Sequence, residues 1–126
     1  MKDSVSLLVL SCSLYKNIWT PFFSLLKEYW PECTLKIYLG TDEYADNDIH
    51  KEHNITVLKT DIKPFVNNYT ERVTDFLRQI DTKYVLLFQE DHVLDAKVHN
   101  QEIIDCFNIL ENNKQYKGIR LHGVGP

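Results

Sequence analysis

The sequence predicts an α/β fold, in which a mostly parallel sheet is covered by helices on both faces to give three layers. Short apolar runs typical of buried strands alternate with segments whose apolar residues recur every three or four positions, as they do in helices that pack on a sheet. The length of 126 residues fits one domain spanning the whole chain. An apolar fraction of 44% and a charged fraction of 25% are typical of a globular protein with a real core.

The predicted strands are residues 4–11, 35–39, 55–58, 83–89 and 118–121. The predicted helices are residues 20–30, 69–80 and 98–110. Thr20 and Pro21 have the pattern of an N-cap followed by a first helical residue, and Pro31 would end that helix. Thr70 is the expected N-cap of the second helix. An acidic, polar loop is expected over residues 42–54.

The fourth predicted strand is the most informative stretch. Five apolar residues, 84–88, are followed directly by Gln89 and by three ionisable residues, Glu90, Asp91 and His92. A continuous apolar run predicts a strand buried on both faces, and ionisable groups at its end cost free energy unless something pairs with them. In open α/β sheets the ligand crevice lies at the carboxyl ends of the strands. This run therefore predicts one wall of a binding site.

Two other polar clusters should lie at the same edge, because the loops that follow parallel strands meet there. The cluster after the first strand contains Ser11, Cys12, Ser13 and Tyr15, and the cluster after the second contains Thr41 and Asp42.

The acidic cluster suits a hard divalent cation. Mg²⁺ and Mn²⁺ prefer oxygen ligands, often one or two carboxylates completed by the phosphates of a substrate. In an extended strand, Glu90 and His92 would share one side and Asp91 would oppose them, so only a turn at Asp91 would gather all three. The alternative is a pair of solvated loop carboxylates without a metal.

Charge and cysteine content exclude several classes of protein. The net charge of −4 argues against nucleic acid as a partner, because phosphate neutralisation needs clustered basic residues. Three widely spaced cysteines without a C-x-x-C motif predict reduced thiols and a cytoplasmic location. No segment approaches the roughly twenty apolar residues of a membrane span. The apolar run 5–10 after Lys2 is interpreted as the first strand rather than a leader.

Several stretches resemble nucleotide-sugar-dependent glycosyltransferases of the GT-A fold, in which an apolar strand ends in an acidic D-x-D region. The resemblance covers most of the chain and rests on short motifs: residues 5–13 with Tyr15, residues 19–23, residues 69–72 and residues 83–91. It implies a Rossmann-like, nucleotide-sugar-binding half of such an enzyme. It also implies a UDP-, GDP- or TDP-sugar donor, a glycan or other hydroxyl acceptor, and Mn²⁺ or Mg²⁺ as cofactor.

The resemblance further implies roles for individual residues. The donor would be bound by Ser11, Cys12, Ser13, Tyr15, Thr41, Asp42 and Arg72, with Arg72 on a phosphate or a sugar hydroxyl. The acidic motif would carry catalysis through Glu90 and Asp91. The metal would be held by Asp91 together with Glu90 or His92. The acidic motif is not a strict D-x-D.

Each assignment has a structural alternative. Tyr15 could pack on the first helix, Asp42 could cap a turn, and Arg72 could pair with a surface carboxylate. The chain itself could be a small complete transferase, a fragment that lacks the acceptor-binding half of a larger one, or a non-catalytic domain that binds a nucleotide or nucleotide sugar.

Overall fold

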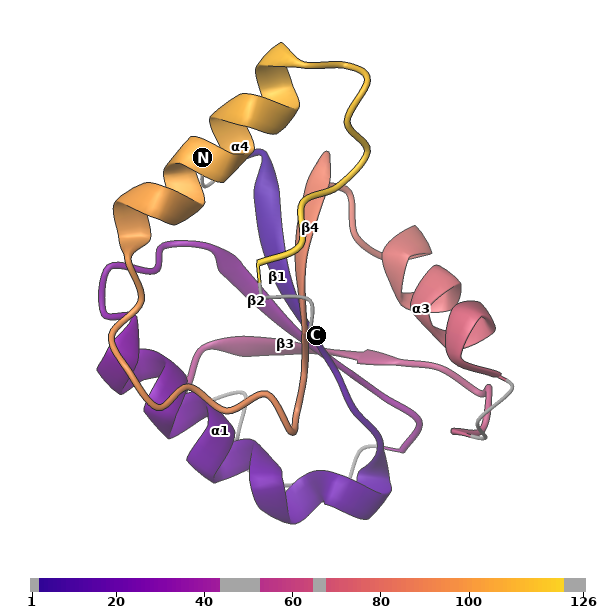
Figure 1. Cartoon of the computed structure of the whole chain (residues 1–126). Coiled ribbons are helices and arrows are strands. Elements are labelled where there is room, and N and C mark those ends of the chain that lie inside the picture. Colours follow the sequence, from indigo (N-terminus) through magenta and orange to yellow (C-terminus); the bar gives the residue numbers. More distant parts are fainter. Residues whose placement is uncertain (1–2, 44–52, 65–67, 122–126) are drawn as a thin grey trace, which may run out of the picture.

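The computed structural model describes residues 3–43, 53–64 and 68–121 and shows an α/β chain (Figure 1). Its elements are, in order, β1 (Val5–Leu10), a 3₁₀ turn η1 (Ser13–Tyr15), α1 (Lys16–Tyr29), β2 (Lys36–Thr41), β3 (Ile55–Lys59), α3 (Tyr69–Arg78), β4 (Tyr84–Gln89) and α4 (Asn100–Asn112). The predicted loop 42–54 lies mostly outside the described residues. No helix in the described part is both long and apolar enough to cross a membrane.

The four strands form one sheet in the order β3-β2-β1-β4, and every pair is parallel. β1 is central, with Val5 opposite Tyr84 on one side and Ser6 opposite Lys36 on the other. All six residues of β1 are buried, which confirms the prediction of a central first strand. All carboxyl ends of the strands therefore lie at one edge of the sheet, as the sequence predicts.

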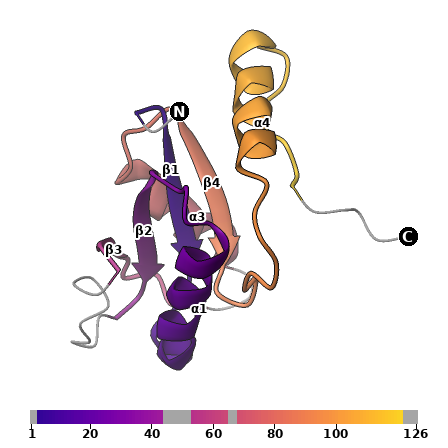
Figure 2. The same cartoon turned by 90° about the vertical axis from the view of Figure 1, so that its left-hand side faces the viewer.

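Alternate residues of β1 pack against different helices. Val5, Leu7 and Val9 share a core cluster with four buried side chains of α1, which are Trp19, Phe22, Phe23 and Leu26. Leu8 and Leu10 share a second cluster with Phe76 of α3. Figure 2 shows α1 and α3 on opposite sides of the strands. The period-two alternation of a strand explains this division.

Helix α1 begins four residues earlier than predicted. Lys16 is its first residue, so Thr20 is inside the helix rather than at its N-cap, and Pro21 is an internal, exposed proline. Trp19 explains the extension, because its side chain is 1% exposed and its indole Nε1 donates to Ser11 Oγ at 2.8 Å. Burial of this large ring stabilises the extra turn and offsets the hydrogen bond that proline cannot donate.

The N-cap predicted for the second helix is also wrong. Asn68 occupies the cap position of α3 and makes no side-chain capping bond there, while Thr70 lies in the first turn. A tertiary contact stabilises the start of the helix instead. The side chain of Arg72 is buried and donates a hydrogen bond to the Ser11 carbonyl in the loop after β1.

The fifth predicted strand does not form. Residues 118–121 have no strand structure, and Ile119 and Leu121 are 37% and 46% exposed. The segment overlaps β4 in Figure 1 but stands away from the sheet in Figure 2. Four residues that begin with a glycine bury too little surface to offset the entropy lost in joining the sheet. β4 is therefore an edge strand within the described part of the chain.

Gly40 in β2 is required by the close approach of α3. A Cβ atom at this position would lie 2.8 Å from ring carbons of Phe76, which is fully buried. The glycine thus allows α3 to lie close to the sheet, which in turn places Arg72, one helical turn before Phe76, beside the end of β1.

We expect Gly40→Ala to destabilise the fold by about 1–3 kcal/mol, because overpacking forces the Phe76 ring or the backbone to shift. Urea unfolding followed by circular dichroism measures this cost. The matched control is Gly118→Ala, whose added Cβ would meet no atom within 4 Å and should change stability by less than about 0.5 kcal/mol. Equal effects of the two substitutions would contradict the packing argument.

Candidate functional site

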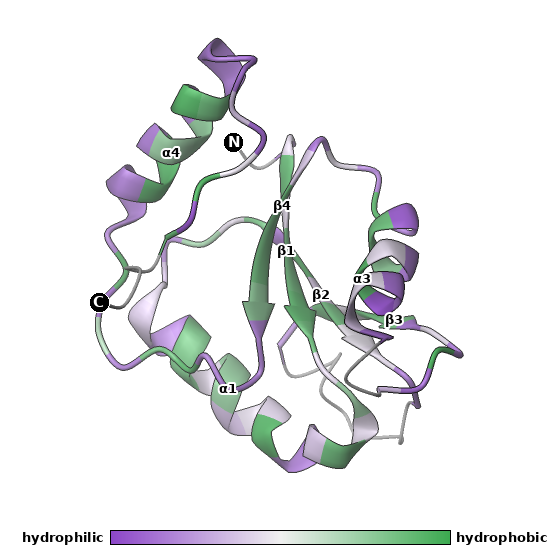
Figure 3. Cartoon of the chain, turned by 45° about the vertical axis from the view of Figure 1, so that its right-hand side comes forward, coloured by the Kyte–Doolittle hydropathy of each residue, from purple (hydrophilic) through white to green (hydrophobic). Residues whose placement is uncertain are grey.

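The candidate site is a cavity between the carboxyl ends of β1 and β4. β1 continues through α1 to β2 on one side, whereas β3 continues through α3 to β4 on the other side of β1. The connections therefore diverge at this point, which is where open α/β sheets bind ligands. Figure 3 shows the ends of β1 and β4 side by side near the start of α1. The cavity measures about 200 Å³ and is lined by Leu10, Ser11, Cys12, Leu14, Tyr15, Pro64, Tyr69, Arg72, Gln89 and Glu90.

Asp42 connects the loop after β2 to the loop after β1. Its Oδ1 accepts a hydrogen bond from the Ser13 backbone N–H at 2.8 Å, and its Oδ2 accepts one from Ser13 Oγ at 3.2 Å. Partial burial alone would raise the pKa of Asp42, but the hydrogen bonds, led by that from the Ser13 backbone N–H, together hold the pKa below its usual value. The two predicted residues are thus brought together, and Asp42 has the capping role that was its structural alternative.

Three other predicted donor-binding residues are occupied by contacts within the fold. Ser11 is buried and its hydroxyl accepts from Trp19. Thr41 is fully buried and its Oγ1 donates to the Glu43 carbonyl at 3.1 Å. Cys12 lines the cavity, but burial raises the pKa of its thiol, which keeps it protonated. Ser11 and Cys12 therefore line the cavity, whereas Thr41 supports the loop after β2 from outside it.

Arg72 is the feature that sets this cavity apart. Its side chain is buried, with the residue 7% exposed, and Nη2 donates to the Ser11 carbonyl at the end of β1. Its Nε has no hydrogen-bond partner among the described residues, and no described carboxylate pairs with it. Among the described residues, the surface ion pair considered for Arg72 is therefore not seen. A buried guanidinium with an unmet donor is costly unless an acceptor binds there.

The acidic motif lies at the rim of the same cavity. The His92 N–H donates to the Gln89 carbonyl at 3.0 Å, so the chain turns at Glu90 and Asp91. Glu90 lines the cavity. Its pKa is raised by burial and further by the charge of Asp91, while the charges of Arg72 and His92 oppose the rise.

Asp91 and His92 point more to solvent, with side chains 71% and 56% exposed and 3.8 Å between His92 Nε2 and Asp91 Oδ1. No group of three or more His, Cys, Asp or Glu side chains in the described part could hold a metal ion. The turn therefore does not assemble Glu90, Asp91 and His92 into a three-ligand site. A site of two carboxylates completed by ligand phosphates remains compatible with this geometry.

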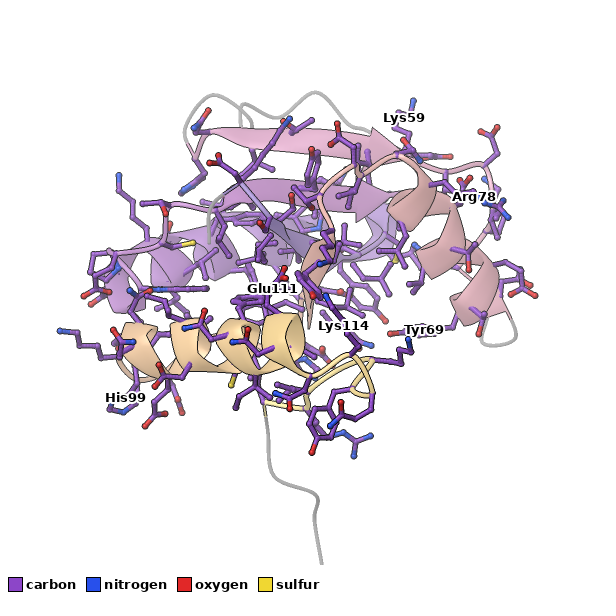
Figure 4. The ribbon with its side chains drawn as sticks, turned by 90° about the horizontal axis from the view of Figure 1, so that it is seen from above. Lys59, Tyr69, Arg78, His99, Glu111 and Lys114 are labelled. Atoms are coloured by element: carbon purple, nitrogen blue, oxygen red, sulfur yellow. The ribbon has the colours of Figure 1, made fainter. Side chains whose placement is uncertain are left out.

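Tyr15 is half exposed and lines the cavity, so it is available to a ligand. Tyr69 and Gln89 also line it, and the Gln89 amide donates to the Tyr69 hydroxyl at 3.4 Å. Tyr69 extends from the start of α3 toward β4 (Figure 4). Neither Tyr69 nor Gln89 is among the site residues predicted from the sequence. Two features of the sequence could have identified them. Tyr69 lies three residues before Arg72, which places both on one side of the helix, and Gln89 lies at the carboxyl end of the fourth strand.

The sequence matches no protein-family model, and a comparison with curated proteins finds no relative.

We expect Asp42→Asn to lower stability by about 1 kcal/mol at pH 7, because the amide keeps one acceptor but loses the charge-assisted bond at a partly exposed site. The folded-state pKa of Asp42 is lowered, so its contribution is present above the unfolded-state pKa and is lost as pH falls through the folded-state value. Urea unfolding at pH 7 and at pH 3 measures the difference between the variant and wild type, which should shrink at pH 3. The control Asp61→Asn removes an exposed carboxylate. A difference that stays constant with pH would argue against the capping role.

Proposed function

We propose that this protein binds a nucleoside-diphosphate sugar at the carboxyl edge of its sheet and acts as a metal-dependent glycosyltransferase of the GT-A type. The observation that carries the proposal is the buried guanidinium of Arg72, which lines a cavity at the point where the connections diverge and has an unmet donor. A phosphate group is the ligand whose chemistry best matches this donor. The resemblance to GT-A transferases then suggests the donor substrate.

The electrostatics of the cavity support an anion. Arginine binds phosphate through charge-assisted hydrogen bonds, which are about twice as strong as neutral ones. Nη2 is already held by the Ser11 carbonyl, so the guanidinium is oriented before a ligand arrives. Little entropy would then be lost on binding. Glu90, which also lines the cavity, would repel a phosphate unless it is protonated or neutralised by a cation.

A divalent cation would supply that neutralisation. Glu90 and Asp91 are the side chains that would hold it, together with oxygens of the diphosphate, because Mg²⁺ and Mn²⁺ need only one or two carboxylates in such sites. Bound there, the cation stabilises charge that develops on the departing diphosphate. Burial is the main cause of the raised pKa of Glu90, and the charge of Asp91 raises it further, so a cation between the two carboxylates would offset both effects.

The remaining walls suit the nucleoside. Tyr15 presents a half-exposed aromatic ring beside the cavity, and rings of this kind stack on bases. The Asp42–Ser13 contact makes the loop that carries Tyr15 rigid. In the transfer itself, the bond from the sugar to the phosphate breaks and the nucleoside diphosphate leaves with the electron pair. The acceptor oxygen forms the new bond to the sugar, and its proton passes to the departing diphosphate or to water.

The first test is nucleotide binding to Arg72 variants. Titration calorimetry with UDP-, GDP- and TDP-sugars in the presence of Mn²⁺ should show one tight donor for the wild type. Arg72→Lys keeps the charge but loses the planar fork, and we expect it to weaken binding about 10- to 100-fold. Arg78→Lys is the matched control, because Arg78 is exposed on the same helix, and it should leave binding unchanged. Thermal unfolding verifies that each variant is folded, and equal binding by all three proteins would rule out Arg72 as the phosphate ligand.

The second test concerns the metal. We expect Mn²⁺ to tighten donor binding in the wild type and to have no such effect in Asp91→Asn. The substitution replaces a charged carboxylate, which is a preferred ligand of Mn²⁺, by a neutral amide. Asp95→Asn, which changes an exposed aspartate four residues later, should retain the effect of Mn²⁺. If Mn²⁺ tightens binding equally in both variants, Asp91 does not hold the ion.

An assay of donor hydrolysis and of sugar transfer to hydroxyl acceptors then distinguishes an active transferase from a non-catalytic binding domain. Turnover that requires Arg72 and Mn²⁺ supports the transferase. Tight binding of a nucleotide sugar without any turnover supports the alternative, a non-catalytic domain that binds nucleotide sugars.

A further inference from the structure

A second, larger depression lies along the free edge of β4. It measures about 810 Å³ and is lined by Trp30, Tyr69, Val85, Leu86, Leu87, Phe88, Gln89, His92, Val93, Leu94, Val98, Ile103, Gly118, Ile119, Arg120 and Leu121. We name it the edge groove. β4 contributes residues from both of its faces, so the groove follows the edge that no strand of the described part covers.

The edge groove is apolar and partly open. Leu87, Val93, Ile119 and Leu121 line it and are between 37% and 46% exposed. Figure 3 shows β4 as almost entirely hydrophobic. A strand with this composition is normally buried on both faces, and apolar side chains gathered at an open edge mark a binding surface. The groove is within the size range of pockets that bind small molecules.

The groove and the cavity of Arg72 share two residues. Tyr69 and Gln89 line both, and the hydrogen bond between them lies where the two meet. A ligand in the groove would therefore place one end beside the candidate donor site. Among the described residues, the basic side chains that line the groove are His92 and Arg120 and no carboxylate lines it, so a cationic ligand is disfavoured.

We propose that the edge groove binds the apolar part of a hydroxyl-bearing acceptor, an amphiphile whose alkyl chain lies along β4 and whose hydroxyl group lies near Tyr69 and Gln89. This inference rests on the proposed function, because it assigns the acceptor class for the same site. The reason for choosing this ligand is that the groove and the cavity adjoin each other. The alkyl chain of an acceptor can lie in the groove while its hydroxyl group lies next to the donor cavity.

The test uses octyl glucoside below its critical micelle concentration, with glucose as the probe that lacks the chain, and it is carried out without nucleotide or metal. We expect octyl glucoside to bind at least about 100-fold more tightly than glucose, because each buried methylene contributes favourably. In the wild type, the methyl NMR signals of Leu87 and Val93 should shift on titration, while that of Ile109, which does not line the groove, should not. Equal affinity for the two probes, or shifts absent from Leu87 and Val93, would overturn the proposal.

Variants provide an independent measurement. Leu87→Gln and Val93→Gln should each weaken octyl glucoside binding about fivefold, because each replaces part of the apolar wall. Ile109→Gln is the matched control, since Ile109 is 45% exposed and Leu87 is 40% exposed. Unchanged binding by the two groove variants would also overturn the proposal.

The design separates this inference from the proposed function. If octyl glucoside binds the groove but no nucleotide sugar binds the wild type, the proposed function fails and the apolar site stands. If nucleotide sugars bind through Arg72 but octyl glucoside does not bind the groove, the acceptor assignment alone fails.

Discussion

The buried guanidinium of Arg72 and the Ser11 carbonyl form the contact on which the site depends. Arg72 belongs to α3 and Ser11 follows β1, and the two residues are 61 positions apart in the chain. This bond ties the helix on one face of the sheet to the end of the central strand. It forms because Gly40 leaves space for the Phe76 ring, which holds α3 close to β2. The Arg72 guanidinium carbon then lies 6.0 Å from the centre of that ring.

The same loop after β1 is held from two other directions. The indole N–H of Trp19 in α1 donates a hydrogen bond to the Ser11 hydroxyl. The Asp42 carboxylate accepts hydrogen bonds from the backbone N–H and from the hydroxyl of Ser13. The Trp19 contact satisfies a buried indole N–H, and the Asp42 contacts satisfy two partly buried donors of Ser13. Their combined effect is a rigid wall, in which the polar groups predicted to bind a ligand are mostly used for support. The side chains that line the cavity without such a supporting role are the half-exposed Tyr15 and Glu90, and the buried guanidinium of Arg72 lies in the wall beside them.

The edge groove adjoins the cavity that Arg72 lines. Tyr69 and Gln89 lie between this small cavity, with its buried guanidinium, and the larger groove with apolar walls. A ligand that spans both would need an anionic part and an apolar part, or two ligands would meet at these residues. The proposed transfer of a sugar from a nucleotide to an amphiphilic acceptor has this chemistry, and the acceptor proposal depends on the donor proposal because the two depressions share Tyr69 and Gln89.

The sequence by itself determined which segments form strands and helices and which edge of the sheet carries the polar clusters. Apolar runs and helical periodicity are local signals, so the four strands and the convergence of Ser13 with Asp42 could be predicted. Only the tertiary structure decided that residues 118–121 stay outside the sheet, that α1 starts at Lys16, and that Arg72 is buried. The physical reason is that each of these depends on contacts between residues far apart in the chain. An arginine three residues into a helix gives no local sign that its guanidinium will reach a carbonyl 61 residues away.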